Sequence, residues 1–438
     1  MPPSTPALSE VVTVLCIALI LTVPFAIAGL CLINTGLGRS RSAAHMMMCS
    51  LGVVGVAALV YFVIGYAWQG YAGGPAYYFT VGGKQWNWIA AERFFMRDVP
   101  LDISLPSLSV WLEILSVGLA AIIPLGSGAD RWRVSGAALS TILLAGLTYP
   151  LFAHWVWGGG WLEQLGENYG IGQGFIDAAG SSTIHSVGGL TALSIAWILG
   201  PRQGKYARDG MPTAIPGHNA VYVTFGCFLS LIGWIGLNGA GAILLTDVDP
   251  GNVVLIAVNT ILCAVSAGLT AAIVTKVRFR KPDASLSVNG WVGGLVASSA
   301  VCAFIRPPEA VVVGAVAGAL VTFSVEWFEL KLHVDDPGGA ISAHALGGLW
   351  GVLAVGLFGT AGITGLANHG QLLAQFVGIG TLLGFVFPLT YGLNWMLDRV
   401  YCQRVQPEGE RQGMDLFELG GGAYPEFMTH DDPYERGG

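Results

Sequence analysis

Residues 177–190 read DAAGSSTIHSVGGL, and residues 336–349 read DPGGAISAHALGGL. Both stretches follow the spacing D-x2-G-x4-H-x2-G-G-L, in which His185 of the first copy matches His344 of the second. Each copy opens an apolar segment, and the glycines three and four positions after the histidine share its helical face. Small residues on that face let a second helix approach closely. The repetition therefore predicts two related helices that pack together with their histidines near one another.

The composition of the chain excludes a soluble protein. Apolar residues make up 53% of the 438 residues and charged residues only 11%, which is too few to cover the surface of soluble domains of this size. The 63 glycines are typical of helices that pack inside a bilayer. A formal charge of -7 without a strongly basic stretch argues against a nucleic-acid partner. Seven scattered cysteines form neither a disulfide framework nor a CxxC metal site.

Eleven apolar segments are long enough to cross about 30 Å of hydrocarbon, which takes about 20 helical residues. The predicted spans are residues 11–33, 44–68, 105–125, 134–155, 181–199, 219–245, 253–275, 286–305, 310–328, 341–358 and 372–397. The residues before Val11 lack Lys and Arg, so we expect the first segment to be a span and not a cleaved signal peptide.

The basic residues fall on alternate loops. One side holds Arg39, Arg41, Arg131, Arg133, Arg202, Lys205, Arg208, Lys276, Arg278, Arg280, Lys281 and Lys331. The positive-inside rule then places the N-terminus outside and the C-terminus in the cytoplasm of a multi-pass protein of the cell (plasma or inner) membrane. We expect an all-α polytopic membrane protein with two inverted five-helix repeats and a C-terminal helix. Residues 1–402 would form the transmembrane domain and residues 403–438 a cytoplasmic tail.

The two repeat histidines are the first candidates for chemistry. If pseudo-symmetry brings His185 and His344 together, two neutral imidazoles form a donor-acceptor chain that can take a proton from a bound cation and pass it on. A plain interhelical hydrogen bond is the structural alternative. Paired helical histidines can also be axial haem ligands, so a membrane redox protein remains a further alternative.

Besides the two matched histidines, three residues are candidates for holding a cation. Asp177 begins its helix, where it would cap unpaired N–H groups or stabilise a cation near the pore mouth. Glu113 lies about two turns inside a span, where it needs a partner, a water-filled cavity or protonation, unless it faces lipid headgroups. Trp157 precedes three glycines, and its indole face could hold a cation.

Further motifs lie outside the repeat. They are Trp157-Gly-Gly-Gly, Gly233-Trp-Ile-Gly-Leu-Asn238, Lys281-Pro with Asn289-Gly290, Asp335-Asp-Pro-Gly-Gly-Ala-Ile-Ser-Ala-His344, and the tail from Arg404 through Gly413-Met-Asp415 to Ala423-Tyr424. Together with the repeat, they resemble the ammonium transporter (Amt/Mep/Rh) family over nearly the whole chain.

The resemblance implies a transporter and not an enzyme, without a cofactor, assembled as a homotrimer with one pore in each subunit. It implies that ammonium is recruited at an outer aromatic site that includes Trp157 and Asp177 and is then deprotonated. Ammonia would pass a narrow apolar pore lined by His185 and His344, and methylammonium is a further candidate substrate.

Four positions depart from the family pattern. Ser116 and Leu237 stand where the family usually has two stacked phenylalanines, Gly241 where it has a serine that helps bind ammonium, and Glu113 in place of a polar amide. Lost aromatic faces weaken cation-π attraction, while a carboxylate strengthens Coulomb attraction. We therefore expect ammonium transport, and an ammonium-binding sensor that signals through its tail is the alternative.

The tail is acidic, whereas the loops on the same side are basic. These opposite charges attract over about 8 to 10 Å at physiological salt, so we expect the segment to about Tyr424 to lie against the loops and the stretch beyond Phe427 to be solvated. The resemblance adds a signalling protein of the PII class as a candidate partner on this face.

Overall fold

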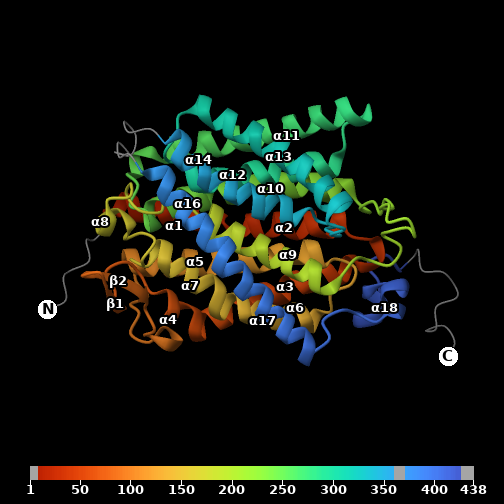
Figure 1. Ribbon diagram of the computed structural model, residues 1–438, viewed down its shortest axis with the longest axis horizontal. Helices are drawn as coiled ribbons and strands as arrows, with labels where there is room; N and C mark the ends of the chain where they lie inside the picture. The colour runs from red at the N-terminus through yellow and green to blue at the C-terminus, as the bar shows by residue number, and fades with distance from the viewer. Residues whose placement is uncertain (1–7, 360–369, 426–438) are drawn as a thin grey trace.

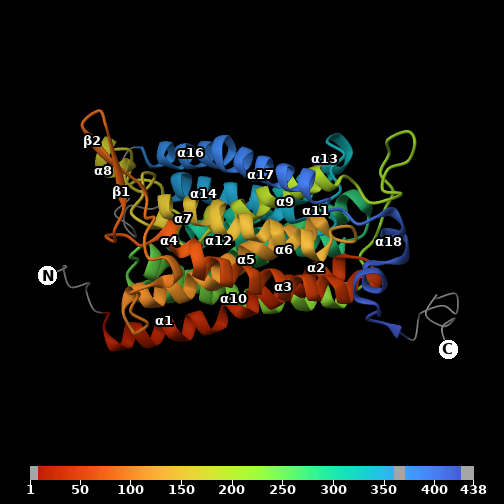
Figure 2. The same ribbon diagram turned by 90° about the horizontal axis from the view of Figure 1, so that it is seen from below.

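The computed structural model describes residues 8–359 and 370–425. Its long helices run side by side along the longest axis of the molecule (Figure 1, Figure 2). A hairpin of strands β1 (Tyr77–Val81) and β2 (Lys84–Ile89) lies at one end, and helix α18 (Pro407–Gln412) lies at the other. We call these the hairpin end and the tail end.

Ten helical segments of the described chain are long and apolar enough to cross a membrane. The five before residue 200 are Glu10–Leu37 with α1 (Glu10–Thr22) and α2 (Pro24–Leu37); Ser40–Gln69 with η1 (Ser40–Ser42), α3 (Ala43–Val60), η2 (Tyr61–Gly65) and α4 (Tyr66–Gln69); Leu105–Gly128, which is α5; Val134–Trp157 with α6 (Val134–Leu143), η4 (Leu144–Thr148) and α7 (Tyr149–Trp157); and Ser181–Leu199 with η5 (Ser181–Ser186) and α9 (Val187–Leu199). Short helices η3 (Phe94–Met96) and α8 (Leu165–Tyr169) lie in the loops between them.

The other five follow residue 219. They are Ala220–Leu245, which is α10; Pro250–Phe279 with η6 (Pro250–Asn252) and α11 (Val253–Phe279); Pro307–Lys331, which is α13; Ile341–Phe358 with η7 (Ile341–Leu346) and α14 (Gly347–Phe358); and Gln371–Val400 with α16 (Gln371–Thr381), η8 (Leu382–Val386) and α17 (Phe387–Val400). Beyond α17 lie α18 and the short helix η9 (Asp415–Leu419).

The predicted span over residues 286–305 corresponds to helix α12 (Ala284–Val301). This helix is rich in glycine and serine, so it is less apolar than the ten segments above, and it packs against α10, α11, α13 and α14. A helix surrounded by other helices does not need an apolar outer face. The predicted class, an all-α polytopic membrane protein, is therefore confirmed, and a count of eleven spans is compatible with it.

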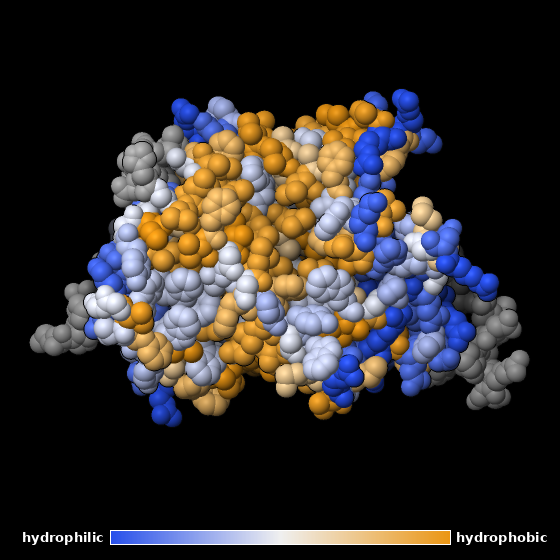
Figure 3. Space-filling model, viewed as in Figure 1, coloured by the Kyte–Doolittle hydropathy of each residue, from blue (hydrophilic) through white to orange (hydrophobic). Residues whose placement is uncertain are grey.

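The outer faces of the long helices carry exposed apolar side chains. Examples are Val11, Leu51, Val221 and Val277, each at least 69% exposed. Figure 3 shows apolar side chains gathered over the middle of one face, with the most hydrophilic ones toward the two ends. A soluble protein seldom exposes so much apolar surface, whereas lipid covers it in a bilayer.

The two repeat copies pack against each other as the sequence predicted. Helix η5 contacts α14, and η7 contacts α9, so the contact is reciprocal. A side chain at Gly189 would collide with the backbone of Ala345, and one at Gly348 would collide with Ser186. Ala345 and Ser186 are equivalent positions, each directly after its histidine. The matched glycines therefore bring the two histidine-bearing turns into contact.

Four charged side chains form a buried network at the tail end. Arg202 lies 2.9 Å from both Asp130 and Asp335, and Arg131 lies 3.8 Å from Asp335. All four residues are at most 4% exposed. Burial alone would raise the pKa of the Asp335 carboxyl, but Arg131 and Arg202 outweigh it and lower this pKa to about 2. Each charge of the network thus has an opposite partner, and the network joins loops of both halves.

The tail docks on the same end, as the opposite charges predicted. Asp415 accepts a hydrogen bond from the backbone N–H of His45 at 2.7 Å, at the start of α3. Glu418 accepts one from the His45 ring and one from the backbone N–H of Val134, both at 2.9 Å, at the start of α6. Docking is therefore confirmed as far as Tyr424, whose hydroxyl contacts a loop histidine. The solvated stretch predicted beyond Phe427 lies outside the described residues.

Candidate functional site

The two repeat histidines meet in the interior of the bundle. The Nδ1 atoms of His185 and His344 are 3.4 Å apart, and the residues are 0% and 4% exposed. The predicted hydrogen-bond contact between these rings is therefore confirmed. The His185 ring also stacks on Trp234, with centroids 4.9 Å apart and planes 11° from parallel. Its Nε2 atom has no hydrogen-bond partner among the described residues, so one end of the pair is free to bind a further group.

Each histidine lies in a π-helical turn, η5 or η7, and not in a regular α-helix. A π turn widens the helix by one residue and frees backbone groups, and such turns are frequent at functional sites. Gly180, with φ of 104°, and Gly339, with φ of 63°, lead the chain into these turns. Both glycines belong to the matched spacing because other residues rarely adopt this left-handed backbone.

Asp177 caps the first of these turns. Its carboxylate accepts hydrogen bonds from the backbone N–H groups of Gly180, Ser181, Ser182 and Thr183 and from the hydroxyls of Ser182 and Thr183, at 2.5 to 3.2 Å. A carboxylate offers about four lone-pair positions, so these donors saturate it. Of the two roles expected for Asp177, the geometry supports capping and leaves no oxygen free for a cation.

Asp336 is the equivalent cap of the second turn. It accepts hydrogen bonds from the Ser127 hydroxyl at 2.7 Å and from the backbone N–H groups of Ala340 and Ile341 at 3.1 and 2.8 Å. Burial raises the pKa of the Asp336 carboxyl even though these donors favour its charged form. Both aspartates of the repeat therefore cap the turn that follows them, but Asp336 accepts fewer hydrogen bonds than Asp177.

Trp157 lies directly beside Asp177. Its indole N–H donates a hydrogen bond to the backbone carbonyl of Asp177 at 2.7 Å, and only 5% of the residue is exposed. Asp177 therefore positions Trp157 through its backbone while its side chain caps the helix. Trp157 also lines a small cavity at the hairpin end, which Glu113 shares.

Glu113 lies inside the bundle and does not face lipid headgroups. It is 2% exposed, and its Oε2 accepts a hydrogen bond from the Tyr149 hydroxyl at 2.6 Å. Its Oε1 has no hydrogen-bond partner among the described residues. The interfacial alternative for this residue is therefore wrong, and the carboxylate belongs to the wall of the cavity that Trp157 lines.

Ser116, Leu237 and Gly241, three of the positions that depart from the family pattern, are all buried. Ser116 donates its hydroxyl to the Leu112 carbonyl at 2.9 Å, and Leu237 is 1% exposed. A Cβ atom at Gly241 would lie 2.7 Å from that of Ala179, in the segment that leads into η5. The close approach of α10 to this segment therefore excludes a serine at position 241 without local movement. No aromatic pair can form from Ser116 and Leu237.

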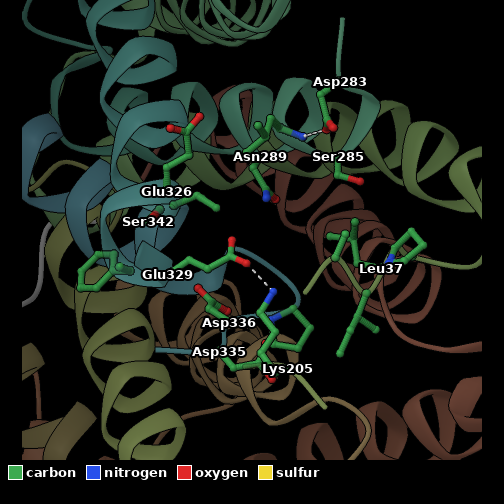
Figure 4. A pocket seen from close by; sticks show the side chains of 18 of the residues that line it. Leu37, Lys205, Asp283, Ser285, Asn289, Glu326, Glu329, Asp335, Asp336 and Ser342 are labelled. Carbon is green, nitrogen blue, oxygen red and sulfur yellow. Dashed lines mark hydrogen bonds and ion pairs between the residues drawn. The ribbon is translucent and has the colours of Figure 1, made fainter. Parts of the chain in front are cut away.

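A second cavity of about 480 Å³ opens at the tail end (Figure 4). Glu329 and Lys205 point toward one another across it and form an ion pair. Ser342 lines the cavity two residues before His344, is 1% exposed, and its hydroxyl has no hydrogen-bond partner among the described residues. The sequence alone does not single out Ser342, because this serine lies within the repeat at a position that the two copies do not share.

The geometry does not suit a haem between the paired histidines. The rings of His185 and His344 touch, with centroids 5.3 Å apart and the nearest nitrogens 3.4 Å apart, which leaves no room for a macrocycle and its iron. Residues 8–359 and 370–425 also contain no group of three or more His, Cys, Asp or Glu that could hold a metal ion.

The sequence matches known proteins over nearly its whole length. A model of the Ammonium Transporter Family matches residues 12–424. The ammonium transporter Amt2 of Archaeoglobus fulgidus is 35% identical over 422 residues, which cover 93% of this chain and 86% of that protein. The ammonium transporter of Bacillus subtilis is 31% identical over 408 residues, which cover 91% of this chain and 95% of that one.

Solved structures share the fold. A protein described as a Sensor Amt Protein superposes with a TM-score of 0.83 at 28% identity, over 93% of this chain and 97% of that one. Mep2 of Candida albicans superposes with a TM-score of 0.79 over 98% of this chain and 92% of its own, and its 23% identity supports a common fold alone.

Proposed function

This chain belongs to the ammonium transporter family, and from that premise we propose that it moves ammonium across the membrane as ammonia, past the paired histidines. The observation that carries the proposal is the contact between His185 and His344. Two neutral imidazoles in contact can accept a proton on one nitrogen and release one from another. The free Nε2 of His185 supplies an end where such a transfer can begin.

Entry to this path is at the hairpin end. Trp157 and Glu113 recruit the cation there, one by its indole face and the other by its charge. Asp177 supports recruitment indirectly, because its carbonyl holds Trp157 and its carboxylate is saturated by helix donors. Ser116 and Leu237 stand where the family usually has two stacked phenylalanines, and Gly241 where it has a serine. The attraction of ammonium to this site therefore depends more on the charge of Glu113 than on aromatic faces. The cavity beside Ser342 is the exit.

The orientation follows from the basic loops. The hairpin end lies outside the cell and the tail end in the cytoplasm, in the cell membrane, with the N-terminus outside. Residues 403–438 act as a regulatory tail on the transmembrane domain of residues 1–402, and the protein works as a homotrimer. A PII-class protein would bind the tail end, where the docked tail already bridges the first turns of α3 and α6.

The test is the substitution His344→Ala in the full chain, reconstituted in liposomes. Removal of one ring breaks a two-membered relay, so ammonium-dependent uptake and charge movement should fall by about 100-fold, the scale of a lost acid-base group. His333→Ala is the matched control, because that histidine is exposed in a tail-end loop.

Size-exclusion chromatography must show that His344→Ala still assembles, since a buried partner left unpaired costs stability. Unchanged uptake and selectivity in this variant would rule out the relay. Ammonium binding by the wild-type protein without any uptake would instead favour the sensor.

A further inference from the structure

Four of the side chains that line the small cavity at the hairpin end are Tyr61, Tyr66, Gln69 and Glu113, and Tyr149 contacts Glu113 from behind. We call these five side chains the Glu113 chamber. The cavity has a volume of about 70 Å³, and Trp157 and Ala72 lie on its wall as well. Four of its side chains come from two neighbouring spans, while Glu113 comes from α5. Leu244 and Leu245 of α10 also line the cavity, and neither repeat histidine is among the described residues that line it.

Hydrogen bonds fix one side of the carboxylate and leave the other side open. The Tyr149 hydroxyl donates to Glu113 Oε2 at 2.6 Å, and the Tyr61 hydroxyl donates to the Gln69 side-chain oxygen at 2.8 Å. The Gln69 side chain is a second polar neighbour of the Glu113 carboxylate. Glu113 Oε1 is buried without a hydrogen-bond partner among the described residues. A donor that enters the cavity thus meets this free oxygen.

Two π-helical turns border the chamber and contact each other. Tyr61 opens η2, and Tyr149 directly follows η4. The backbone of Gln69 is held in turn, because its carbonyl accepts a hydrogen bond from His154 Nδ1 at 2.6 Å. The groups around Glu113 are therefore set by tertiary contacts and are not free to reorient toward Oε1.

No described Lys, Arg or His forms an ion pair with this carboxylate. Among the described residues that line the cavity, the titratable ones besides Glu113 are Tyr61, Tyr66 and Tyr71, and Tyr149 contacts the carboxylate from behind. Arg93 lies over the Tyr71 ring, 5.5 Å from its centroid. A buried carboxylate without a cation either binds one or takes a proton.

We propose that Glu113 is the first proton acceptor for the ammonium ion, a role that rests on the transport function proposed above. An N–H bond of ammonium breaks and its electron pair stays on nitrogen, while an O–H bond forms on Glu113 Oε1. Ammonium and a carboxylate become ammonia and a carboxylic acid. Water in the cavity then takes the proton from Glu113, which restores the carboxylate and forms a hydronium ion whose proton the histidine relay proposed above can accept. A glutamine at this position can bind the cation but cannot take its proton.

The test is infrared difference spectroscopy on the full chain in liposomes, with and without ammonium chloride. A carbonyl band of a newly protonated carboxylic acid should arise with ammonium, vanish in Glu113→Gln and persist in the control Glu167→Gln. Glu167 is an exposed carboxylate of α8 at the same end. Tyr149→Phe removes one hydrogen bond to the carboxyl, so it should shift the frequency of the band and not delete it.

Uptake measured on the same liposomes separates the two proposals. We expect Glu113→Gln to lower ammonium uptake at least tenfold and to change its dependence on outer pH. A wild-type protein with uptake but without the band, or a band that survives Glu113→Gln, would overturn the acceptor role and leave transport standing. A wild-type protein without uptake would overturn transport itself.

Discussion

The two ends of the bundle treat buried charge in opposite ways. At the tail end, Asp130, Arg131, Arg202 and Asp335 are all at most 4% exposed, and each lies within 3.8 Å of an opposite charge. At the hairpin end, Glu113 is 2% exposed, and its polar partners in the described part of the chain, Tyr149 and Gln69, are uncharged. The same burial therefore surrounds a closed ionic network at one end and a carboxylate without a cation at the other.

The difference shows which buried charges belong to the architecture. Removal of a charge from water costs several kcal/mol, and an opposite charge with good geometry offsets that cost. At the tail end the offset is present, so those residues tie the loops of both halves together. At the hairpin end no opposite charge offsets the free-energy cost of burying Glu113. A buried ionisable group that costs stability in this way is expected to have a function in a membrane protein.

The largest effect should come from opening the tail-end network. The substitution Arg202→Met leaves Asp130 and Asp335 without their shared partner, which should lower the free energy of unfolding by about 3 to 5 kcal/mol. Thermal unfolding of the detergent-purified protein, followed by tryptophan fluorescence, measures it. Glu113→Gln is the contrasting variant, and it should not lower stability, because it removes a carboxylate that no cation compensates.

Arg411→Met is the control for charge alone, since the ion pair of Arg411 with Glu408 is exposed. Equal losses of stability for Arg202→Met and Glu113→Gln would abolish the contrast between the two ends.

A smaller effect should appear in acid. The folded pKa of Asp335 is about 2, against 3.8 for the free side chain, so its stabilisation is complete above about pH 3.8 and is lost as pH falls toward 2. At 1.36 kcal/mol for each pKa unit, the loss is about 2 kcal/mol. Asp335→Asn should be less stable at neutral pH and should lack this acid step. An acid-induced loss of the same size in the variant would show that other carboxylates cause it.

Features of the fold and site that repeat in the sequence could be predicted from it, whereas features set by contacts between distant residues could not. The contact of His185 with His344 was predictable, because the same spacing occurs twice and glycines mark the packing faces. The docked tail was predictable from opposite charges. The sequence did not reveal the π turns around the histidines, because no residue pattern marks them, and η2, η4 and η8 are also π turns although they lie outside the repeat.

The environment of Glu113 was also beyond the sequence. Tyr149 and Gln69 come from other spans, and no local pattern relates them to Glu113. Whether Glu113 faces lipid headgroups or the bundle interior depends on where the span begins. A shift of this predicted boundary by a few residues changes the expected burial of Glu113. Asp177 shows the same limit, since only the folded structure reveals that hydrogen-bond donors saturate its carboxylate.

The smallest effect should come from the tail, where the Glu418 carboxylate is paired but 14% of its side chain is exposed. Glu418 accepts hydrogen bonds from the His45 ring and from the N–H of Val134, so it caps α6 and holds the tail at once. Loss of such a cap costs about 1 kcal/mol. Glu418→Gln should therefore leave the melting temperature nearly unchanged while limited proteolysis cuts the tail faster. Glu408→Gln, at an exposed tail position, is the matched control and should be cut at the wild-type rate. If Glu418→Gln destabilised the bundle as much as Arg202→Met, the tail would be part of the buried network and not a segment docked upon it. If the tail of Glu418→Gln were cut at the same rate as that of Glu408→Gln, the Glu418 contacts would not hold the tail and Asp415 would hold it instead.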